Sequence, residues 1–292
     1  LYPTMTEADY EYILNHSESQ YCAVSNQELY DKVMSIKDKI PTLKDVFVFD
    51  RSATGRHWSE IAEAGSDDQQ SELTSRMDAV DPSEMATIIY TSGTTGDPKG
   101  VKLTHRMITQ MSCSVNMKLG SELLGEKDCY ISYLPAAHSF EQGLFGCSMI
   151  YGMQCGFYGG DPLKLVSDDL PALKPTFFPS VPRLYNRIYG KIKDKLALAT
   201  GIKKTLVDKA VASKLAGLKS SGKVTHCLWD KLVFNKVKAM LGGRVRFMIT
   251  GSAPISCDVL DFLKICFCAP IAEGYGMTET MAGSCLTFHD DP

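Results

Sequence analysis

The sequence predicts an α/β fold with mainly parallel strands flanked by helices. The chain has 292 residues, of which 44% are hydrophobic, and this is enough to bury a substantial core. Short β-rich runs alternate with helical stretches along almost the whole chain, which is the pattern of parallel strands joined by helical crossovers. The sequence contains no internal repeat.

The first 50 residues predict two helices and two strands. A helix over 6–16 and a strand over 21–25 come first. The sequence SNQE at 25–28 then has the form of a capping box that opens a helix over 27–39, because the serine and the glutamate can satisfy each other's free backbone amides. A strand over 45–50 follows.

The middle of the chain begins with a polar connection. Residues 51–84 lose the apolar period and gain Ser, Asp and Gln, so a surface connection with one or two helical turns is expected. A helix from about Thr104 to Lys118 is expected behind a glycine-rich loop at 91–100. The other expected elements are strands over 85–91, 129–135 and 154–159 and a helix over 139–152.

Charge and cysteine content limit the classes of function. A net charge of -3 and a pI near 6.1 argue against nucleic-acid binding, which needs a basic excess. Ten scattered cysteines without a C-x-x-C pair argue against a zinc site and indicate a reducing, intracellular compartment. Cys266 and Cys268 lie in an apolar run and are expected to be packed in the core, so no thiol is assigned a catalytic role.

The ends of the chain resemble cuts in a longer protein. The sequence begins without a methionine and contains neither a signal peptide nor an apolar run of about 18 residues.

Residues 183–238 form a basic, helical region with fourteen Lys and Arg against three Asp. Two interpretations stay open. The region is either a solvated helical face or a basic surface that meets an anionic membrane or a phosphorylated cofactor.

The loop TSGTTGDPKG at 91–100 has the composition of an oxyanion site. Its residues that let backbone amides approach a ligand are Gly93, Gly96 and Gly100. Its hydroxyl donors are Thr91, Ser92, Thr94 and Thr95. Lys99 adds a full positive charge. A strand before such a loop and a helix behind it would make a phosphate cradle, and a hydroxyl-rich hairpin without function is the alternative.

Two common nucleotide-binding loops do not match this sequence. The nucleoside-triphosphatase loop requires G-x-x-x-x-G-K-[ST], whereas Pro98 precedes Lys99 here and Gly100 follows it. The dinucleotide fingerprint G-x-G-x-x-G also fails, because the third glycine is missing.

Three motifs in order resemble those of the acyl-adenylate-forming enzymes: YTSGTTGDPKG at 90–100, ITGSAPIS at 249–256 and EGYGMTET at 273–280. The intervening stretches, such as YLPAAHSFEQ at 133–142, are similar to eukaryotic long-chain fatty acyl-CoA synthetases. The resemblance covers essentially the whole chain. It implies that residues 1–292 are the central part of the large AMP-binding domain, and that the start of this domain and a small mobile C-terminal domain lie outside the chain.

The resemblance implies an activity and its cofactors. Members of this family use ATP and Mg²⁺ to join a long-chain fatty acid to coenzyme A through an acyl-adenylate, releasing pyrophosphate and AMP. The chain by itself is expected not to turn over. Another acid-activating enzyme of the superfamily and an inactive scaffold subunit that retains the fold remain as alternatives.

The resemblance also assigns roles to residues of the three motifs. The loop from Thr91 to Gly100 would hold the outer phosphates, with the Lys99 charge opposite the departing pyrophosphate. The adenine slot would be lined by Gly251, Ser252, Ala253 and Pro254. The third motif would complete the nucleotide site with Glu273, Gly274, Tyr275, Gly276, Met277 and Thr278.

The resemblance also gives individual side chains a specific chemistry. Tyr275 would stack on adenine, and Thr278 would donate to the α-phosphate. Glu279 would be the Mg²⁺ ligand, with Thr91 as a weaker second candidate. His138 would lie beside the acyl carboxylate, with Glu141 either orienting it or capping the helix.

The resemblance suggests a location as well. An enzyme of this kind would be peripheral on the endoplasmic reticulum, the mitochondrial outer membrane or the peroxisomal membrane. Nothing in the sequence predicts the oligomeric state.

Overall fold

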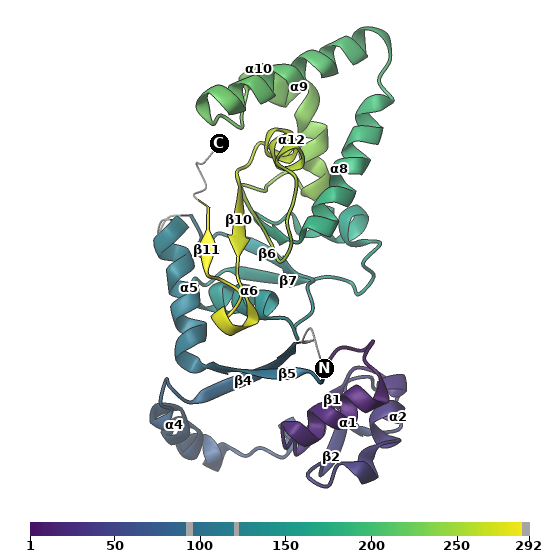
Figure 1. Ribbon diagram of the computed structural model, residues 1–292, viewed down its shortest axis with the longest axis vertical. Coiled ribbons are helices and arrows are strands. Elements are labelled where there is room, and N and C mark those ends of the chain that lie inside the picture. The colour runs from purple at the N-terminus through teal and green to yellow at the C-terminus, as the bar shows by residue number, and fades with distance from the viewer. Residues whose placement is uncertain (92–95, 120–122, 288–292) are drawn as a thin grey trace. The chain divides into compact units, whose positions relative to one another are not determined.

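The computed structural model describes residues 1–91, 96–119 and 123–287, without the side chains of residues 116 and 119 (Figure 1). The chain divides into two compact units, Leu1–Arg106 and Met107–Pro292. Each unit contains its own mainly apolar core. The predicted α/β class with mainly parallel strands is confirmed, since most strand pairs are parallel.

The first unit is built on a parallel sheet with the strand order β1–β2–β3. Its strands are β1 (Tyr21–Val24), β2 (Asp45–Val48) and β3 (Arg56–His57). Its first two helices are α1 (Glu7–His16) and α2 (Gln27–Met34). Apolar residues of both helices and of β1 and β2 share one buried cluster, which includes Leu14, Val33 and Val48.

The predicted cap of α2 was wrong by one residue. Asn26, not Ser25, is the N-cap, and its side chain accepts a hydrogen bond from the Leu29 backbone N–H at 3.0 Å. Asparagine caps helices as well as serine does, and this start places Leu29 and Val33 in the core. The helix also ends at Met34, before a short 3₁₀ turn, η1 (Lys37–Lys39).

Residues 51–84 lie at the surface, and every one of them is exposed or half-buried. The stretch contains α3 (Ser59–Glu63), η2 (Asp67–Gln69) and the ten-residue helix α4 (Gln70–Ala79). Its helical content therefore exceeds the one or two turns predicted from the loss of apolar period.

The glycine-rich loop connects two antiparallel strands, β4 (Met85–Thr91) and β5 (Lys99–Thr104), in which Thr91 pairs with Lys99 (Figure 1). The helix expected from about Thr104 to Lys118 is confirmed as α5 (His105–Leu119), but the strand β5 that lies between it and the loop was not predicted. The strand follows from the period-2 alternation in KGVKLT, which buries Leu103 completely. Among the described residues, β5 and not a helix N-terminus follows the loop, and Lys99 at the start of β5 carries the positive charge.

The second unit contains a four-stranded sheet with the order β11–β10–β9–β8. Its strands are β8 (Phe177–Ser180), β9 (Phe247–Gly251), β10 (Ile271–Tyr275) and the antiparallel edge strand β11 (Cys285–Leu286). A parallel pair adjoins it, made of β6 (Cys129–Ser132) and β7 (Gln154–Phe157) with α6 (Ser139–Ile150) between them. The Thr176 backbone N–H donates to the Cys129 carbonyl at 2.9 Å, which places β6 beside β8.

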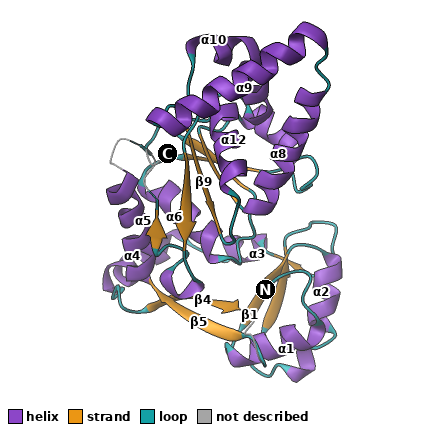
Figure 2. Ribbon diagram, turned by 45° about the horizontal axis from the view of Figure 1, so that its top comes forward, coloured by secondary structure: helices purple, strands orange, loops and turns teal. Residues whose placement is uncertain are grey.

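Helices cover this sheet and bury its central strand. The long helices α8 (Pro182–Ala197), α9 (Gly201–Ser221) and α12 (Cys257–Phe267) pack on one another (Figure 2). Shorter helical segments complete the unit: η3 (Leu165–Asp169), α7 (Leu170–Leu173), α10 (Cys227–Trp229), η4 (Asp230–Phe234), α11 (Asn235–Lys238), η5 (Ala239–Leu241) and η6 (Thr278–Thr280). Every residue of β9 is buried, as expected for a parallel strand packed on both faces.

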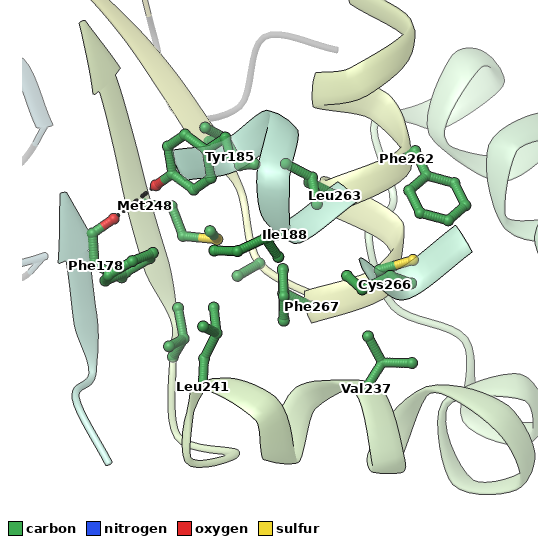
Figure 3. Packing of buried hydrophobic residues seen from close by; sticks show 14 of the residues in the cluster. Phe178, Tyr185, Ile188, Val237, Leu241, Met248, Phe262, Leu263, Cys266 and Phe267 are labelled. Carbon is green, nitrogen blue, oxygen red and sulfur yellow. Dashed lines mark hydrogen bonds between the residues drawn. The ribbon is translucent and has the colours of Figure 1, made fainter. Parts of the chain in front are cut away.

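Tyr185 connects helix α8 to two strands of the sheet. Its ring packs against Phe178, and its hydroxyl donates to the Phe178 carbonyl at 2.8 Å and to the Ile249 carbonyl at 3.2 Å (Figure 3). The buried hydroxyl is thereby satisfied, and α8 is fixed to both β8 and β9. Over the described part of the chain, no helix is both long enough and apolar enough to cross a membrane.

Asp128 links the starts of three strands. It lies just before β6 and is 2% exposed. It accepts hydrogen bonds from the Thr176 hydroxyl at 2.6 Å and from Arg246 Nε at 2.8 Å, residues that directly precede β8 and β9. Burial alone would raise the pKa of Asp128, but the hydrogen bonds from Arg246, Thr176 and Gly125 together hold it below its ordinary value.

We predict that Asp128→Asn lowers the free energy of unfolding by about 2 kcal/mol at pH 7, because hydrogen bonds to a buried charge are lost. The folded-state pKa is lowered, so this contribution is complete above the unfolded pKa of about 3.9 and disappears as pH falls through the folded value. Urea titrations at several pH values measure it. Asp208→Asn is the control, since its ion pair with Lys204 is exposed; equal losses in the two variants would contradict the prediction.

Candidate functional site

The second and third sequence motifs meet at the carboxyl ends of two paired strands. Gly251 ends β9 and pairs with Gly274 of β10. The segment 252–254 continues from β9, and the segment 276–279 continues from β10. In parallel sheets this end is where ligands bind, because the loops that leave neighbouring strands converge there.

A polar cavity of about 190 Å³ lies at this end of the sheet. Its lining includes the predicted site residues His138, Gly251, Ser252, Gly274, Gly276, Met277 and Thr278. The structure thus brings together residues that are up to 140 positions apart in the sequence, counting from 138 to 278. Of the residues predicted from the second and third motifs, those outside this lining are Ala253, Pro254, Glu273, Tyr275 and Glu279.

The backbone around the cavity is tightly folded. A side chain at Gly276 would place its Cβ 1.8 Å from the carbonyl oxygen of Ala282, so only glycine fits. Ser252 has a φ of 73° and Ala282 a φ of 71°, which non-glycine residues adopt at an energetic cost. As a result, backbone peptide groups border the cavity, and side chains do not fill it.

His138 is the N-cap of α6. Its Nδ1 accepts a hydrogen bond from the Phe140 backbone N–H at 3.1 Å, which places the proton of the neutral ring on Nε2. Burial lowers the pKa of His138 below its ordinary value, so the ring is neutral at physiological pH. His138 therefore brings an N–H donor to the cavity without a full charge.

Glu141 takes neither of the roles considered for it. His138 itself caps the helix, and among the described residues Glu141 makes no hydrogen bond to His138. Its Oε1 instead accepts from the Ser132 hydroxyl at 2.5 Å, while Oε2 is buried without a partner in the described chain. Burial raises the pKa of Glu141 above its ordinary value.

Thr250 is a cavity residue that the sequence did not reveal. It is 1% exposed, and its hydroxyl has no hydrogen-bond partner among the described residues. A buried, unpaired hydroxyl is costly unless a ligand or water satisfies it. In the sequence it stands inside the apolar run FMITG, where it resembles an ordinary strand residue. The other lining residues that were not predicted are Ser139, Phe140, Ile249 and Ala282.

The side chains assigned to adenine and metal face solvent. Tyr275 is 65% exposed, which leaves the face of its ring accessible to a planar ligand. Glu279 is exposed in η6 and forms no ion pair with any other described residue. An exposed, unpaired carboxylate suits a hard cation such as Mg²⁺.

The phosphate loop belongs to the first unit, whereas the polar cavity belongs to the second. Ser92, Gly93, Thr94 and Thr95 lie outside the described residues. Gly96, which directly follows these four residues, has a φ of 88°, a conformation that favours glycine. Lys99 is exposed at the start of β5, so its ammonium group is accessible to an anion.

An apolar cavity of about 400 Å³ adjoins the polar one. Its lining includes Met111, Val115, Leu144, Phe177 and Leu286. The two cavities share Phe140, Ile249, Gly274 and Ala282 as lining residues. The apolar and the polar lining therefore meet at these four residues.

Comparisons with known proteins show the family of the chain. The family model described as AMP-binding enzyme matches residues 1–292. The chain is 40% identical to long chain acyl-CoA synthetase 6, peroxisomal, of Arabidopsis thaliana, over 96% of this chain and 40% of that protein. It is 38% identical to human long-chain-fatty-acid–CoA ligase 1, over 100% of this chain and 43% of that protein.

A solved structure shows the same fold. The long-chain-fatty-acid-CoA ligase FadD1 of Archaeoglobus fulgidus superposes with a TM-score of 0.67 at 21% identity, over 99% of this chain and 48% of that one. The chain thus spans less than half the length of each of these three proteins. Because the family model matches residues 1–292, the chain belongs to the AMP-binding enzyme family.

Proposed function

We propose that this chain supplies the ATP and fatty-acid sites of a long-chain fatty acyl-CoA synthetase. The single observation that carries the proposal is the junction of the two cavities at Phe140, Ile249, Gly274 and Ala282. It suits a molecule with an apolar chain and a carboxylate that must meet a nucleotide. The names of the most similar proteins support the same class of acid.

The first step needs no general base. A carboxylate is already ionised at neutral pH, so it can attack the α-phosphorus of ATP directly as pyrophosphate departs. The site must hold the carboxylate and ATP in position, and it must provide hydrogen-bond donors for the negative charge. The Nε2–H of His138 and the hydroxyl of Thr278, both at the polar cavity, are suited to this role.

Other residues would hold the nucleotide. We assign the outer phosphates to the loop 91–100 with Lys99, and the adenine ring to Tyr275 and the backbone from Gly251 to Pro254. Mg²⁺ would be held by Glu279, with Thr91 as the weaker candidate, and would neutralise phosphate charge. The second step, in which the thiol of coenzyme A displaces AMP, is assigned to the whole protein, and the chain alone is expected not to turn over.

We predict that Lys99→Ala and Glu279→Ala each reduce ATP–pyrophosphate exchange by the full-length protein about a hundredfold or more, because each removes charge stabilisation from the reacting phosphates. Lys102→Ala is the matched control, since Lys102 is also an exposed lysine of β5 but pairs three residues further along the hairpin. A loss of less than about threefold in either site variant would refute its assigned role.

Two variants separate the two functions of His138, which are to cap α6 and to donate a hydrogen bond through Nε2. His138→Asn keeps an N-cap acceptor but removes the Nε2–H donor, so we expect slower adenylation with unchanged unfolding free energy. His138→Ala removes both and should also lower the unfolding free energy by about 1 kcal/mol. If His138→Asn retained full exchange activity, the histidine would be structural only.

We further propose that part of the basic region meets an anionic membrane. Apart from Lys214 and Lys238, the lysines and arginines of 183–238 are exposed. Lys214 is buried, so its inclusion in the basic surface was wrong. Leu198 and Ile202, at the turn from α8 to α9, are 80% and 82% exposed. Exposed apolar residues among lysines are typical of a surface that inserts shallowly between anionic headgroups. Such contact would make the protein peripheral on an intracellular membrane.

The double variant Leu198→Glu/Ile202→Glu should bind anionic vesicles more weakly than the unchanged protein, because two apolar anchors become repelled charges. Phe157→Glu is the control. Phe157 is also a strongly exposed apolar residue, but it lies on β7, outside the basic region. Vesicle sedimentation at two salt concentrations measures the effect. Equal binding to anionic and neutral vesicles would dismiss the membrane proposal.

A further inference from the structure

Lys214 of α9 is a buried lysine with three partners. Its side chain is 1% exposed. Its Nζ donates to Asp230, to the Ile265 carbonyl at 2.6 Å and to Cys268 Sγ at 3.0 Å. The three donors of an ammonium group are thereby used, and two of the three partners would suffice to neutralise and solvate it. A purely structural lysine at this position would not need the contact between Nζ and Cys268 Sγ.

The geometry fixes the amine and the thiol against each other. Cys268 is the C-cap of α12, where its φ of 55° holds the backbone in the left-handed region. Lys214 is held in turn by Asp230 and by the ring of Phe234, whose centroid lies 4.6 Å from Nζ. Lys214 cannot turn away from Asp230 without leaving a buried charge unpaired, and the backbone of Cys268 is fixed by its place at the helix end. Cys268 is only half-buried, so a small solute can reach this pair.

We propose that Lys214 and Cys268 form a peroxide-sensitive modification site that closes into a covalent sulfur–nitrogen bond. Hydrogen peroxide first converts the Cys268 thiol to a sulfenic acid and releases one water, which oxidises sulfur by two electrons while the peroxide is reduced. Lys214 Nζ then attacks this sulfur as the neutral amine, once the ammonium group has lost a proton. The S–N bond forms and the S–O bond breaks.

The protons of the second step are accounted for by the same cluster. The leaving hydroxyl takes one proton from the ammonium group and departs as water. A second proton passes to the Asp230 carboxylate, which already contacts Nζ. The sum is one thiol, one ammonium and one peroxide giving one sulfenamide, two waters and one proton. A thiol reductant restores both side chains, as it does for other sulfenyl adducts.

The bond would join two parts of the second unit. Lys214 lies in α9, and Cys268 lies in the turn that leads into β10. β10 carries Glu273, Gly274 and Tyr275 toward the polar cavity. The modification is independent of the proposed reaction, because neither Lys214 nor Cys268 lines a cavity described above.

Peptide mapping of the peroxide-treated, intact protein tests the proposal. Trypsin cannot cleave after a modified Lys214, so the expected product is peptide 210–219 linked to the peptide that begins at Ile265, with two hydrogens lost and no oxygen gained. Treatment with dithiothreitol before digestion should abolish this product. Cys266→Ser should still give it and Cys268→Ser should not, and both variants keep the Lys214–Asp230 pair.

Three results would overturn the proposal. One is a linked product that survives in Cys268→Ser. Another is an unlinked Cys268 that is oxidised or that forms a disulfide with Cys266 at the same peroxide dose. The third is a linked pair that retains an oxygen atom, which would rule out the condensation step.

Discussion

The parallel pairing of β9 with β10 is the constraint on which the candidate site depends. It sets Gly251 beside Gly274, so the chain leaves both strands at the same end and with little side-chain bulk. The turn after β10 then folds back on itself, with Gly276 against the Ala282 carbonyl. A one-residue slip in this register would invert which side chains face the cavity and would close it.

Stability and chemistry lie at opposite ends of this sheet. The network of Asp128, Thr176 and Arg246 holds the starts of β6, β8 and β9, whereas the polar cavity lies where β9 and β10 end. The starting ends are thereby fixed by charge and hydrogen bonds. The finishing ends carry strained backbone and the Thr250 hydroxyl, which has no partner in the described part of the chain, and a ligand can relieve both features.

Much of this arrangement could be predicted from the sequence. Strand and helix alternation gave the α/β class, and the three motifs gave the residues that meet at the cavity, such as Ser252 and Thr278. The strand β5 was missed because its alternation is short and follows glycine. Thr250 and the apolar cavity were missed because their residues are ordinary core types, and only tertiary packing determines which of them surround a space. Lys214 was misassigned because sequence position does not reveal burial.

We propose that the two cavities together hold a long acyl chain and its adenylate. The most direct measurement is ATP–pyrophosphate exchange by the full-length protein across straight-chain acids of increasing length. We expect little exchange with acetate and a rise with chain length, because each buried methylene adds about 0.8 kcal/mol of apolar binding until the cavity is filled. Exchange that is equal for acetate and for long-chain acids, or absent with every long-chain acid, would contradict it.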